Sequence, residues 1–301
     1  MRLFVLLATL VVTITVTTAQ GPTFRAGVDL VTFGVTVVDK KGNLVSDLSE
    51  SDFTVIEDGA AQTVRYFARG DGETAPTTHL GLMLDTSGSM ERDLSLARGA
   101  AIKFLKLLPT AEDITLVDFD TEVRVTRYPQ RDFARLVERI RMRKPDGWTA
   151  LYDALGVYLD GADQQNGRSI LVMYTDGADS RSTMNLGNVM ELLKASQTTV
   201  YAVGLLENTG SSRSELRMRL QQMVDATGGQ AFFPYALKEL DAAYEKVLAE
   251  IKAQYHLGYL PTNTTADGNW RKVEIKVTRP DLKVRTRKGY FAPFKDSRSK
   301  P

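Results

Sequence analysis

Residues 79–108 read HLGLMLDTSGSMERDLSLARGAAIKFLKLL, and this stretch decides the fold class. The apolar run over residues 80–84 has the length of a buried strand and ends abruptly at Asp85. Apolar residues then recur at helical spacing, at Leu94, Ala97, Ala101, Leu105 and Leu108. A continuous apolar strand followed by an amphipathic helix is typical of a strand–helix unit whose strand is covered on both faces.

The same alternation continues on the C-terminal side of this stretch. Further apolar runs predict strands, and 3.6-residue periodicity predicts helices, as far as a last helix over residues 240–251. Alternating strands and helices favour an α/β fold with a doubly wound, mostly parallel sheet. We therefore predict one α/β domain over residues 78–254.

The two flanks of this domain have β texture instead. In residues 26–70 the apolar positions alternate with polar or small ones, and Asp58-Gly59 is a hairpin signal. Residues 255–293 show the same alternation, and a polar tail follows over residues 294–301. Each flank is too short to form a stable sheet domain alone. We expect the two flanks to form one small β-sandwich, with the α/β domain inserted in it or flanked by it.

The N-terminus predicts export. Met1-Arg2 precedes a short apolar run that ends in small residues, which is the pattern of a secretory signal peptide over residues 1–19. An uncleaved membrane anchor is the alternative, although the run is shorter than the roughly 20 residues a span needs. The chain has no cysteine, which fits a bacterial periplasm or cell exterior better than an animal secreted protein.

Composition excludes several function classes. Lys plus Arg number 38 against 37 for Asp plus Glu, so the chain is not a basic nucleic-acid binder. With two histidines and no cysteine, zinc sites of the Cys/His kind, iron–sulfur clusters and thiol nucleophiles are excluded. Any bound metal must be held mainly by oxygen.

Oxygen-bearing side chains do gather at predicted strand ends. Asp85, Ser87 and Ser89 follow the first strand of the α/β domain, at alternate positions. Thr149 opens a predicted helix, and Asp176 follows a central strand. Because ligands of open α/β sheets sit beyond the carboxyl ends of the strands, these side chains can converge there. Two carboxylates and three hydroxyls suit a hard divalent cation.

These motifs resemble those of a known family. The segments DTSGS (residues 85–89), GWTAL (147–151) and TDG (175–177) are similar, in order and placement, to the metal-site motifs of von Willebrand factor type A domains. The resemblance implies a metal-ion-dependent adhesion site that holds Mg²⁺, or Mn²⁺ or Ca²⁺. It implies that the hydroxyls of Ser87, Ser89 and Thr149 are ligands and that Asp85 and Asp176 bind more often through water. It further implies a protein partner whose Asp or Glu completes the metal shell.

The flanks resemble a group of exported bacterial proteins that carry this domain. The segment DFTVIEDG over residues 52–59 precedes the α/β domain, and YHLGY over residues 255–259 follows it. A final GYF over residues 289–291 completes the likeness. This resemblance implies a cell-envelope location and no particular activity.

Neighbouring residues have two interpretations each. Trp148 replaces a residue that is usually small, so Trp148 and Tyr152 could form an aromatic rim for a partner or could pack internally. Asp118, Asp120 and Asp179 could support the metal loops or could be ordinary turn residues.

Three functions compete at this point. The first is a metal-dependent protein-binding module of the adhesion type, with no enzymatic activity. The second is a structural or assembly protein of the envelope whose metal only stabilises its loops. The third is a hydrolase, which the motifs disfavour because the G-x-S-x-G and H-E-x-x-H patterns are both absent from the sequence. A membrane would be a partner only if the leader is retained.

Overall fold

The structure, a computed structural model, describes residues 30–70, 72, 74–107, 111–235 and 237–294. The predicted signal peptide over residues 1–19 lies outside the described residues. So do residues 26–29 of the predicted N-terminal β segment and all of the predicted tail except its first residue.

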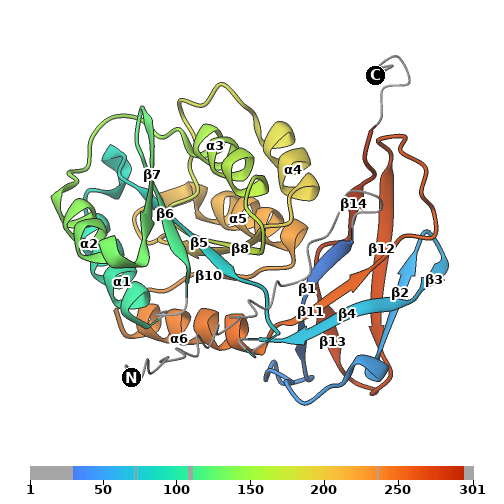
Figure 1. The fold of residues 1–301 in the computed structure, drawn as a ribbon. Coiled ribbons are helices and arrows are strands. Elements are labelled where there is room, and N and C mark those ends of the chain that lie inside the picture. The colour runs from blue at the N-terminus through green and yellow to red at the C-terminus, as the bar shows by residue number, and fades with distance from the viewer. Residues whose placement is uncertain (1–29, 71, 73, 108–110, 236, 295–301) are drawn as a thin grey trace, which may run out of the picture.

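The α/β domain is built on a six-stranded sheet with the strand order β10-β9-β8-β5-β6-β7 (Figure 1). Its strands are β5 (Thr78–Asp85), β6 (Asp113–Phe119), β7 (Val123–Pro129), β8 (Arg168–Thr175), β9 (Thr199–Gly204) and β10 (Ala231–Phe232). Neighbouring strands are parallel except for β7, which runs antiparallel to β6 at the sheet edge.

Six α-helices cover the sheet, three on each face (Figure 1). The first layer contains α1 (Leu94–Leu107), α2 (Phe133–Met142) and α6 (Leu237–Ala253), and the second contains α3 (Leu151–Asp163), α4 (Leu186–Ala195) and α5 (Arg213–Thr227). Short 3₁₀ turns lie at η2 (Gly88–Met90), η3 (Gln130–Asp132) and η4 (Gly210–Ser212).

The strand β5 shows why its sequence is apolar throughout. Successive side chains of a strand point to opposite faces, so Leu82 and Leu84 pack in the α1/α2/α6 core while Met83 packs in the α3/α4/α5 core. All three side chains are buried. The predicted doubly wound, mostly parallel sheet is therefore confirmed. The edge strand β7 was not expected from the sequence, because its exposed middle lacks the apolar run of a buried strand.

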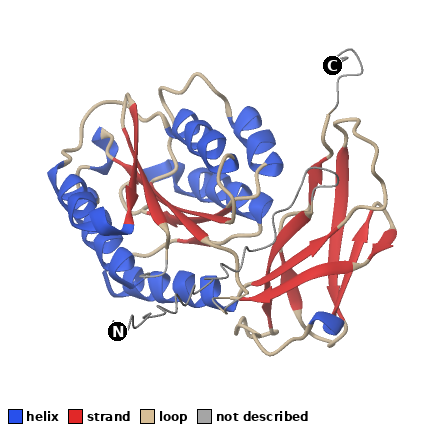
Figure 2. Cartoon of the chain, in the orientation of Figure 1, coloured by secondary structure: helices blue, strands red, loops and turns tan. Residues whose placement is uncertain are grey.

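The two chain ends form a β-sandwich of two antiparallel four-stranded sheets (Figure 2). The first sheet has the order β13-β1-β11-β4 and the second has the order β14-β12-β2-β3. The strands are β1 (Val31–Val38), β2 (Phe53–Glu57), β3 (Ala60–Gln62), β4 (Val64–Arg69), β11 (Tyr255–Tyr259), β12 (Trp270–Val277), β13 (Lys283–Arg285) and β14 (Gly289–Phe291), and the 3₁₀ turn η1 (Glu50–Asp52) precedes β2. The expected antiparallel β unit from both termini is thus present.

The sandwich has its own core with one buried carboxylate. The apolar side chains of β1, β2, β11 and β12 form a separate cluster from the two cores of the α/β domain. Glu57 accepts hydrogen bonds from the hydroxyls of Tyr259 (2.7 Å) and Tyr290 (2.9 Å). The bond from Tyr259 connects the two sheets, and both bonds satisfy a group whose burial would otherwise be costly.

The sandwich and the α/β domain are joined closely. The helix α6 passes almost directly into β11. The chain passes between the two domains at Gly70 and again at Gln254, and Gly70 N donates to Gln254 O at 2.7 Å. Arg285 of β13 forms an ion pair with the buried Glu250 of α6. Among the described residues, no helix has the length and apolar character needed to span a bilayer.

Candidate metal centre

The candidate site lies where the sheet changes winding direction. From β5 the chain first fills one side of the sheet with β6 and β7, and then fills the other side with β8, β9 and β10. Neighbouring strands β5 and β8 therefore flank a topological switch point, where ligands of such sheets bind. Asp85 ends β5 and Thr175 ends β8, and Thr175 Oγ1 donates to Asp85 Oδ2 at 2.6 Å.

The loop after β5 brings three of the predicted ligands into a row. Asp85 Oδ1 accepts hydrogen bonds from Ser87 N (3.0 Å) and Ser87 Oγ (2.6 Å). Ser87 Oγ lies 3.1 Å from Ser89 Oγ. Asp85 and Ser87 are buried while Ser89 is exposed, so the row of oxygens runs from the interior to the surface.

The loop that carries Thr149 is attached to this first loop by backbone hydrogen bonds. Asp146 N donates to Thr86 O (2.9 Å), and Gly88 N donates to Gly147 O (3.0 Å). Gly147 has a φ of +70°, and a Cβ there would lie 2.4 Å from Thr121 Oγ1. The glycine is therefore required both by backbone conformation and by space.

The loop that carries Asp176 is attached in turn to Thr149. The Thr149 carbonyl accepts hydrogen bonds from Ser180 N (2.9 Å) and Arg181 N (3.0 Å), and Ser180 Oγ accepts one from Thr149 N (3.1 Å). Asp176 Oδ1 accepts from Ala178 N at 2.9 Å, which fixes the start of this loop. Three loops from distant parts of the sequence thus form one hydrogen-bonded unit.

The electrostatics of the unit fit a bound cation. Burial and the negative charge of Asp176 together raise the pKa of Asp85 to about 7, against the hydrogen bonds from Ser87 and Thr175 that lower it. Within the described residues, no salt bridge gives either carboxylate a basic partner. A divalent cation would supply the missing charge.

The donor set would consist of oxygen only. In the described part of the chain, no cluster of three or more His, Cys, Asp or Glu side chains could hold a metal ion by itself. The hydroxyls of Ser87, Ser89 and Thr149 would therefore have to contribute, which suits Mg²⁺, Mn²⁺ or Ca²⁺ rather than a softer metal.

Comparison with known proteins agrees with this architecture. A family model described as the von Willebrand factor type A domain matches residues 80–178. The chain contains a von Willebrand factor type A domain. No curated protein matches the chain in sequence.

Several solved structures are similar to parts of this chain. A von Willebrand factor type A protein from Catenulispora acidiphila is 12% identical, with 91% of this chain and 76% of that chain covered and a TM-score of 0.47. The vWF domain of the type V pili tip protein Mfa5 from Porphyromonas gingivalis is 12% identical, with coverages of 59% and 95% and a TM-score of 0.49. The PilB minor pilin from Streptococcus sanguinis is 15% identical, with coverages of 60% and 63% and a TM-score of 0.48.

The two aromatic residues predicted at the rim of the type A domain differ in exposure. Trp148 is 66% exposed, next to Thr149, whereas Tyr152 is only 5% exposed and packs in the α3/α4/α5 core. Of these two residues, only Trp148 is therefore exposed beside the candidate site. The expected two-residue rim is corrected to Trp148 alone, because Tyr152 occupies the first turn of α3 on its buried face.

The three additional aspartates all support the loops. Asp120 O accepts from Ala150 N (2.9 Å), and Asp179 Oδ1 accepts from Tyr152 N (3.2 Å) at the start of α3. Asp118 is buried and pairs with Arg124, Arg139 and Arg143.

Sequence reasoning missed two polar residues of the site. Thr175 and Ser180 were not predicted, although each hydroxyl bonds a predicted ligand residue. The position of Thr175 directly before Asp176 was the one available signal, because side chains at the end of a central strand reach the switch point.

Neither histidine lies near the candidate site. His79 is at the start of β5, at the opposite end of the strand from Asp85, with its ring nitrogens near Asp113 Oδ1 and Asn166 O. His256 lies on β11 of the sandwich. A histidine therefore cannot activate Ser87 as a nucleophile.

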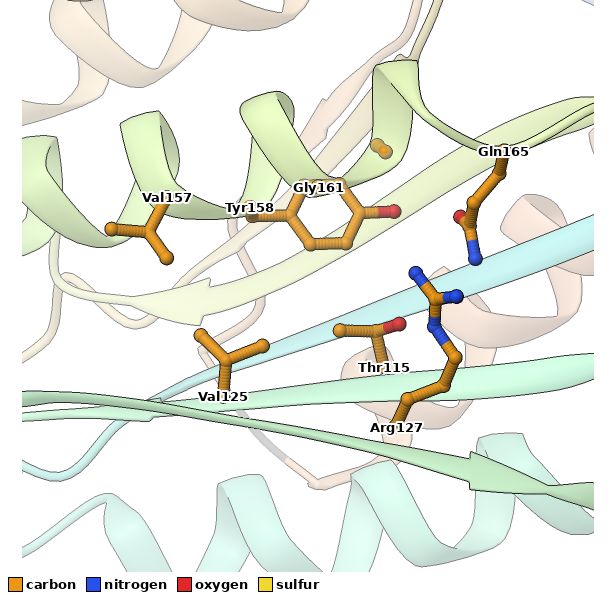
Figure 3. Close-up of a pocket in the computed structure, with 8 residues that line it drawn as sticks. Thr115, Val125, Arg127, Val157, Tyr158, Gly161 and Gln165 are labelled. Carbon is orange, nitrogen blue, oxygen red and sulfur yellow. The ribbon is translucent and has the colours of Figure 1, made fainter.

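A pocket of about 290 Å³ opens between β7 and α3, and it is separate from the candidate site (Figure 3). Val125 and Val157 face each other at one end, while Arg127 and Gln165 lie at the other (Figure 3). None of the predicted ligand residues lines this pocket.

Proposed function

We propose that the protein is a divalent-cation-dependent protein-binding module of the adhesion type. The observation that carries this proposal is the pairing of Asp85 with the charge of Asp176 at the switch point, with no basic side chain of the described residues to neutralise them. A module of this kind binds a partner without transforming it, and no residue in the site needs to act as a general base.

The proposed cation is held by this chain's own oxygens. The hydroxyls of Ser87, Ser89 and Thr149 would be ligands, and Asp85 and Asp176 would bind directly or through water. The cation, preferably Mg²⁺, supplies a Lewis-acidic position that a carboxylate can fill. Exposed Ser89 and Trp148 mark the side from which a partner would approach.

The proposed partner is a protein that presents an Asp or Glu side chain. Its carboxylate would complete the metal shell, while Trp148 would add apolar contact area beside it. We further propose that the protein acts outside the cytoplasm, in the periplasm or beyond, because residues 1–19 have the pattern of a signal peptide.

Thermal melting tests the metal site first. The chain from residue 20 to 301 is melted in EDTA and then in Mg²⁺, Mn²⁺ or Ca²⁺. We expect a concentration-dependent rise in Tm, as mass action requires. Asp85→Ala should abolish the rise, whereas Asp160→Ala, at an exposed position on α3, should keep it. A wild-type chain without any rise would contradict the proposal.

Water relaxation then tests the open position. Mn²⁺ bound to the protein enhances the relaxation of water protons if a water molecule remains on the metal. A peptide that contains Glu should displace this water and lower the enhancement, whereas the same peptide with Gln should not. If both peptides leave the enhancement unchanged while Tm still rises with metal, the cation only stabilises the loops. The protein would then be a structural or assembly component, which is the alternative that the hydrogen-bonded loops favour.

A further inference from the structure

A group of arginines and aromatic rings lies at the same edge of the α/β sheet as the candidate metal centre. Because β5, β8, β9 and β10 are parallel, their carboxyl ends share this edge. Phe233 and Tyr235 follow the end of β10. Arg213 and Arg217 lie in the first turns of α5. All four residues line one depression, and we call them the rim cluster.

The loop that carries Asp176 contacts the helix that carries the arginines of the rim cluster. A Cβ on Gly177 would lie 3.4 Å from Leu216 O, and Leu216 directly precedes Arg217 in α5. The end of β10 is also near, because β10 is the second strand from β8 in the sheet and neighbouring strands lie about 4.8 Å apart. The rim cluster is therefore within reach of a partner that is bound at the metal centre.

Both arginines are held against aromatic rings. Arg217 Cζ lies 4.1 Å from the centroid of the Phe233 ring, and Arg213 Cζ lies 5.7 Å from the centroid of the Tyr235 ring. Phe233 in turn packs on β9, because a Cβ on Gly204 would lie only 2.7 Å from its ring. Stacking of this kind fixes the plane of a guanidinium and leaves the N–H groups at its rim available.

The two arginines have no acidic partner within the described residues. The ion pairs of this part of the chain include neither Arg213 nor Arg217. Arg213 is anchored by backbone carbonyls, with Nε donating to Leu206 O (3.1 Å) and Nη2 to Glu207 O (3.0 Å). Arg217 is exposed, so its guanidinium can hold a carboxylate from outside the chain through two N–H groups.

Three acidic residues near the rim cluster have other contacts. Glu215 pairs with Arg219, one turn further along α5. Glu239 Oε2 accepts a hydrogen bond from Tyr235 N at 2.8 Å. Glu207 lines the same depression, and the contact that it makes with the cluster is through its backbone carbonyl. The cationic groups of the cluster are thus left for an external anion.

From these contacts we propose that the rim cluster is a second anchor for an acidic partner segment. The inference rests on the proposed function, in which one Asp or Glu of the partner completes the metal shell. A second Asp or Glu of the same segment binds the guanidinium of Arg217. The module then recognises a pair of acidic side chains at a fixed spacing, and not a single carboxylate.

The sheet geometry sets this spacing. From the metal centre, between the ends of β5 and β8, to the end of β10 is two to three strand spacings, or about 10–15 Å. An extended segment rises about 3.3 Å per residue and points alternate side chains to the same side. Two acids that are four residues apart therefore match the metal centre and Arg217, whereas two acids that are two residues apart are too close together.

Two peptides of equal charge test the proposal on the Mn²⁺-loaded chain of residues 20–301. Both consist of glycine, serine and threonine, with Glu at the fourth and eighth positions in one and at the fourth and sixth in the other. Displacement of the metal-bound water, followed by proton relaxation, gives the apparent affinity of each. We expect the wider spacing to bind about fivefold more tightly, which is the upper end of what an exposed ion pair contributes.

Variants of the chain then locate the second anchor. Arg217→Gln should remove the preference for the wider spacing, and Arg217→Lys should keep only part of it, because lysine lacks the planar fork. Arg65→Gln, at an exposed position on β4 of the sandwich, should keep the whole preference. All three variants should retain the Mg²⁺-dependent rise in Tm, which shows that the metal centre is intact.

Other results contradict the proposal. If both peptides displace the water with equal affinity, the rim cluster is no anchor, although the proposed function still holds. A preference that survives in Arg217→Gln would likewise exclude the rim cluster as its cause. If neither peptide displaces the water although Mn²⁺ is bound, the proposed function itself fails, and the second anchor fails with it.

Discussion

At the residue scale, Asp85 has the most demanding environment in the candidate site. Its carboxylate accepts hydrogen bonds from Ser87 N, Ser87 Oγ and Thr175 Oγ1. Three donors would ordinarily lower a carboxyl pKa. Burial and the nearby charge of Asp176 nevertheless raise it to about 7. A proton or a cation beside this carboxylate is therefore more favourable than at an ordinary aspartate.

This environment predicts an unusual pH dependence of stability in EDTA. The folded-state pKa of Asp85 is raised from 3.8 to about 7, so the folded state binds more protons than the unfolded state between these values. The resulting stabilisation is complete below the unfolded pKa and is lost as pH rises through about 7, by up to about 1.4 kcal/mol per pH unit. Urea unfolding of the wild type and of Asp85→Asn measures this effect. The free energy of unfolding of the wild type should fall, relative to that of the variant, as pH rises from about 4 to about 7.

Magnesium should reverse this trend. The cation competes with the proton for Asp85, so the stabilisation by Mg²⁺ should grow as pH rises toward 7 and then level off. The same unfolding series with saturating Mg²⁺ measures this effect. A wild-type-minus-variant difference that stays flat with pH in both conditions would show that Asp85 ionises normally.

At the scale of single elements, the start of the Thr149 loop is attached to the sheet by ion pairs. These pairs connect the end of β6 with the end of α2. Asp118 near the end of β6 pairs with Arg139 on α2 and with Arg143 just after it, at 3.3 and 2.5 Å. The chain then continues from Arg143 into the loop that carries Thr149. The Asp118–Arg143 pair is therefore the point from which this loop begins.

Asp118→Asn should weaken both the fold and the metal site. Removal of one partner from a buried ion pair costs about 3–5 kcal/mol, and Asp118 is only 2% exposed. We also expect a lower affinity for Mg²⁺, because the Thr149 loop loses its first attachment. Calorimetric titration with Mg²⁺ and urea unfolding measure the two effects separately.

Glu122→Gln is the matched control for this experiment. Its carboxylate also contacts an arginine, Arg124, but its side chain is 75% exposed. Exposed pairs contribute about 0–1 kcal/mol, so neither stability nor affinity should change noticeably. If Asp118→Asn lowered stability but left the Mg²⁺ affinity at its wild-type value, the pair would have no part in positioning Thr149.

The same elements show what sequence alone can predict. The run through residues 80–84 is apolar because both faces of β5 are buried, so strand, sheet type and the place of Asp85 could all be predicted from it. The exposed edge strand β7 has no such run and was missed. Tyr152 could not be placed, because the sequence does not show which face of α3 its first turn buries. Thr175 was missed because its contact with Asp85 spans 90 residues of sequence.

At the scale of the whole molecule, the junction between the α/β domain and the sandwich contains a neutral histidine. Burial and the nearby positive charge of Arg168 together lower the pKa of His256 from 6.5 to about 3. The unfolded chain therefore binds more protons than the folded chain between these values. Stability due to His256 is complete above about pH 6.5 and is lost as pH falls toward 3.

His256→Gln should remove this acid sensitivity. We expect the wild type to lose stability relative to the variant as pH falls below about 6.5, by up to about 1.4 kcal/mol per pH unit. Urea unfolding in EDTA across this range measures the difference, and Asp85 contributes equally to both proteins. A difference that does not change with pH would mean that His256 can be protonated without disturbing the junction.

The sandwich needs strands from both flanks of the chain, whereas the cores of the α/β domain contain residues of neither flank. The strand β11 lies between β1 and β4, and β12 lies between β14 and β2, so the C-terminal flank supplies an interior strand to each sheet. Without it, only the two-stranded β2–β3 pair keeps its partner, and a lone hairpin is marginally stable. The two cores of the α/β domain, in contrast, draw only on residues 80–251.

Truncation after residue 254 should therefore unfold one part of the molecule and spare the other. In a chain of residues 20–254, we expect the amides of β1 to β4 to exchange rapidly with solvent, while β5, β6, β8 and β9 stay protected and the Mg²⁺-dependent rise in Tm persists. Hydrogen exchange followed by mass spectrometry measures both regions in one experiment, with the chain of residues 20–301 as the control. Protection of β1 and β4 in the truncated chain would contradict this prediction. It would show that the N-terminal flank is stable on the α/β domain alone, without the strands of the C-terminal flank.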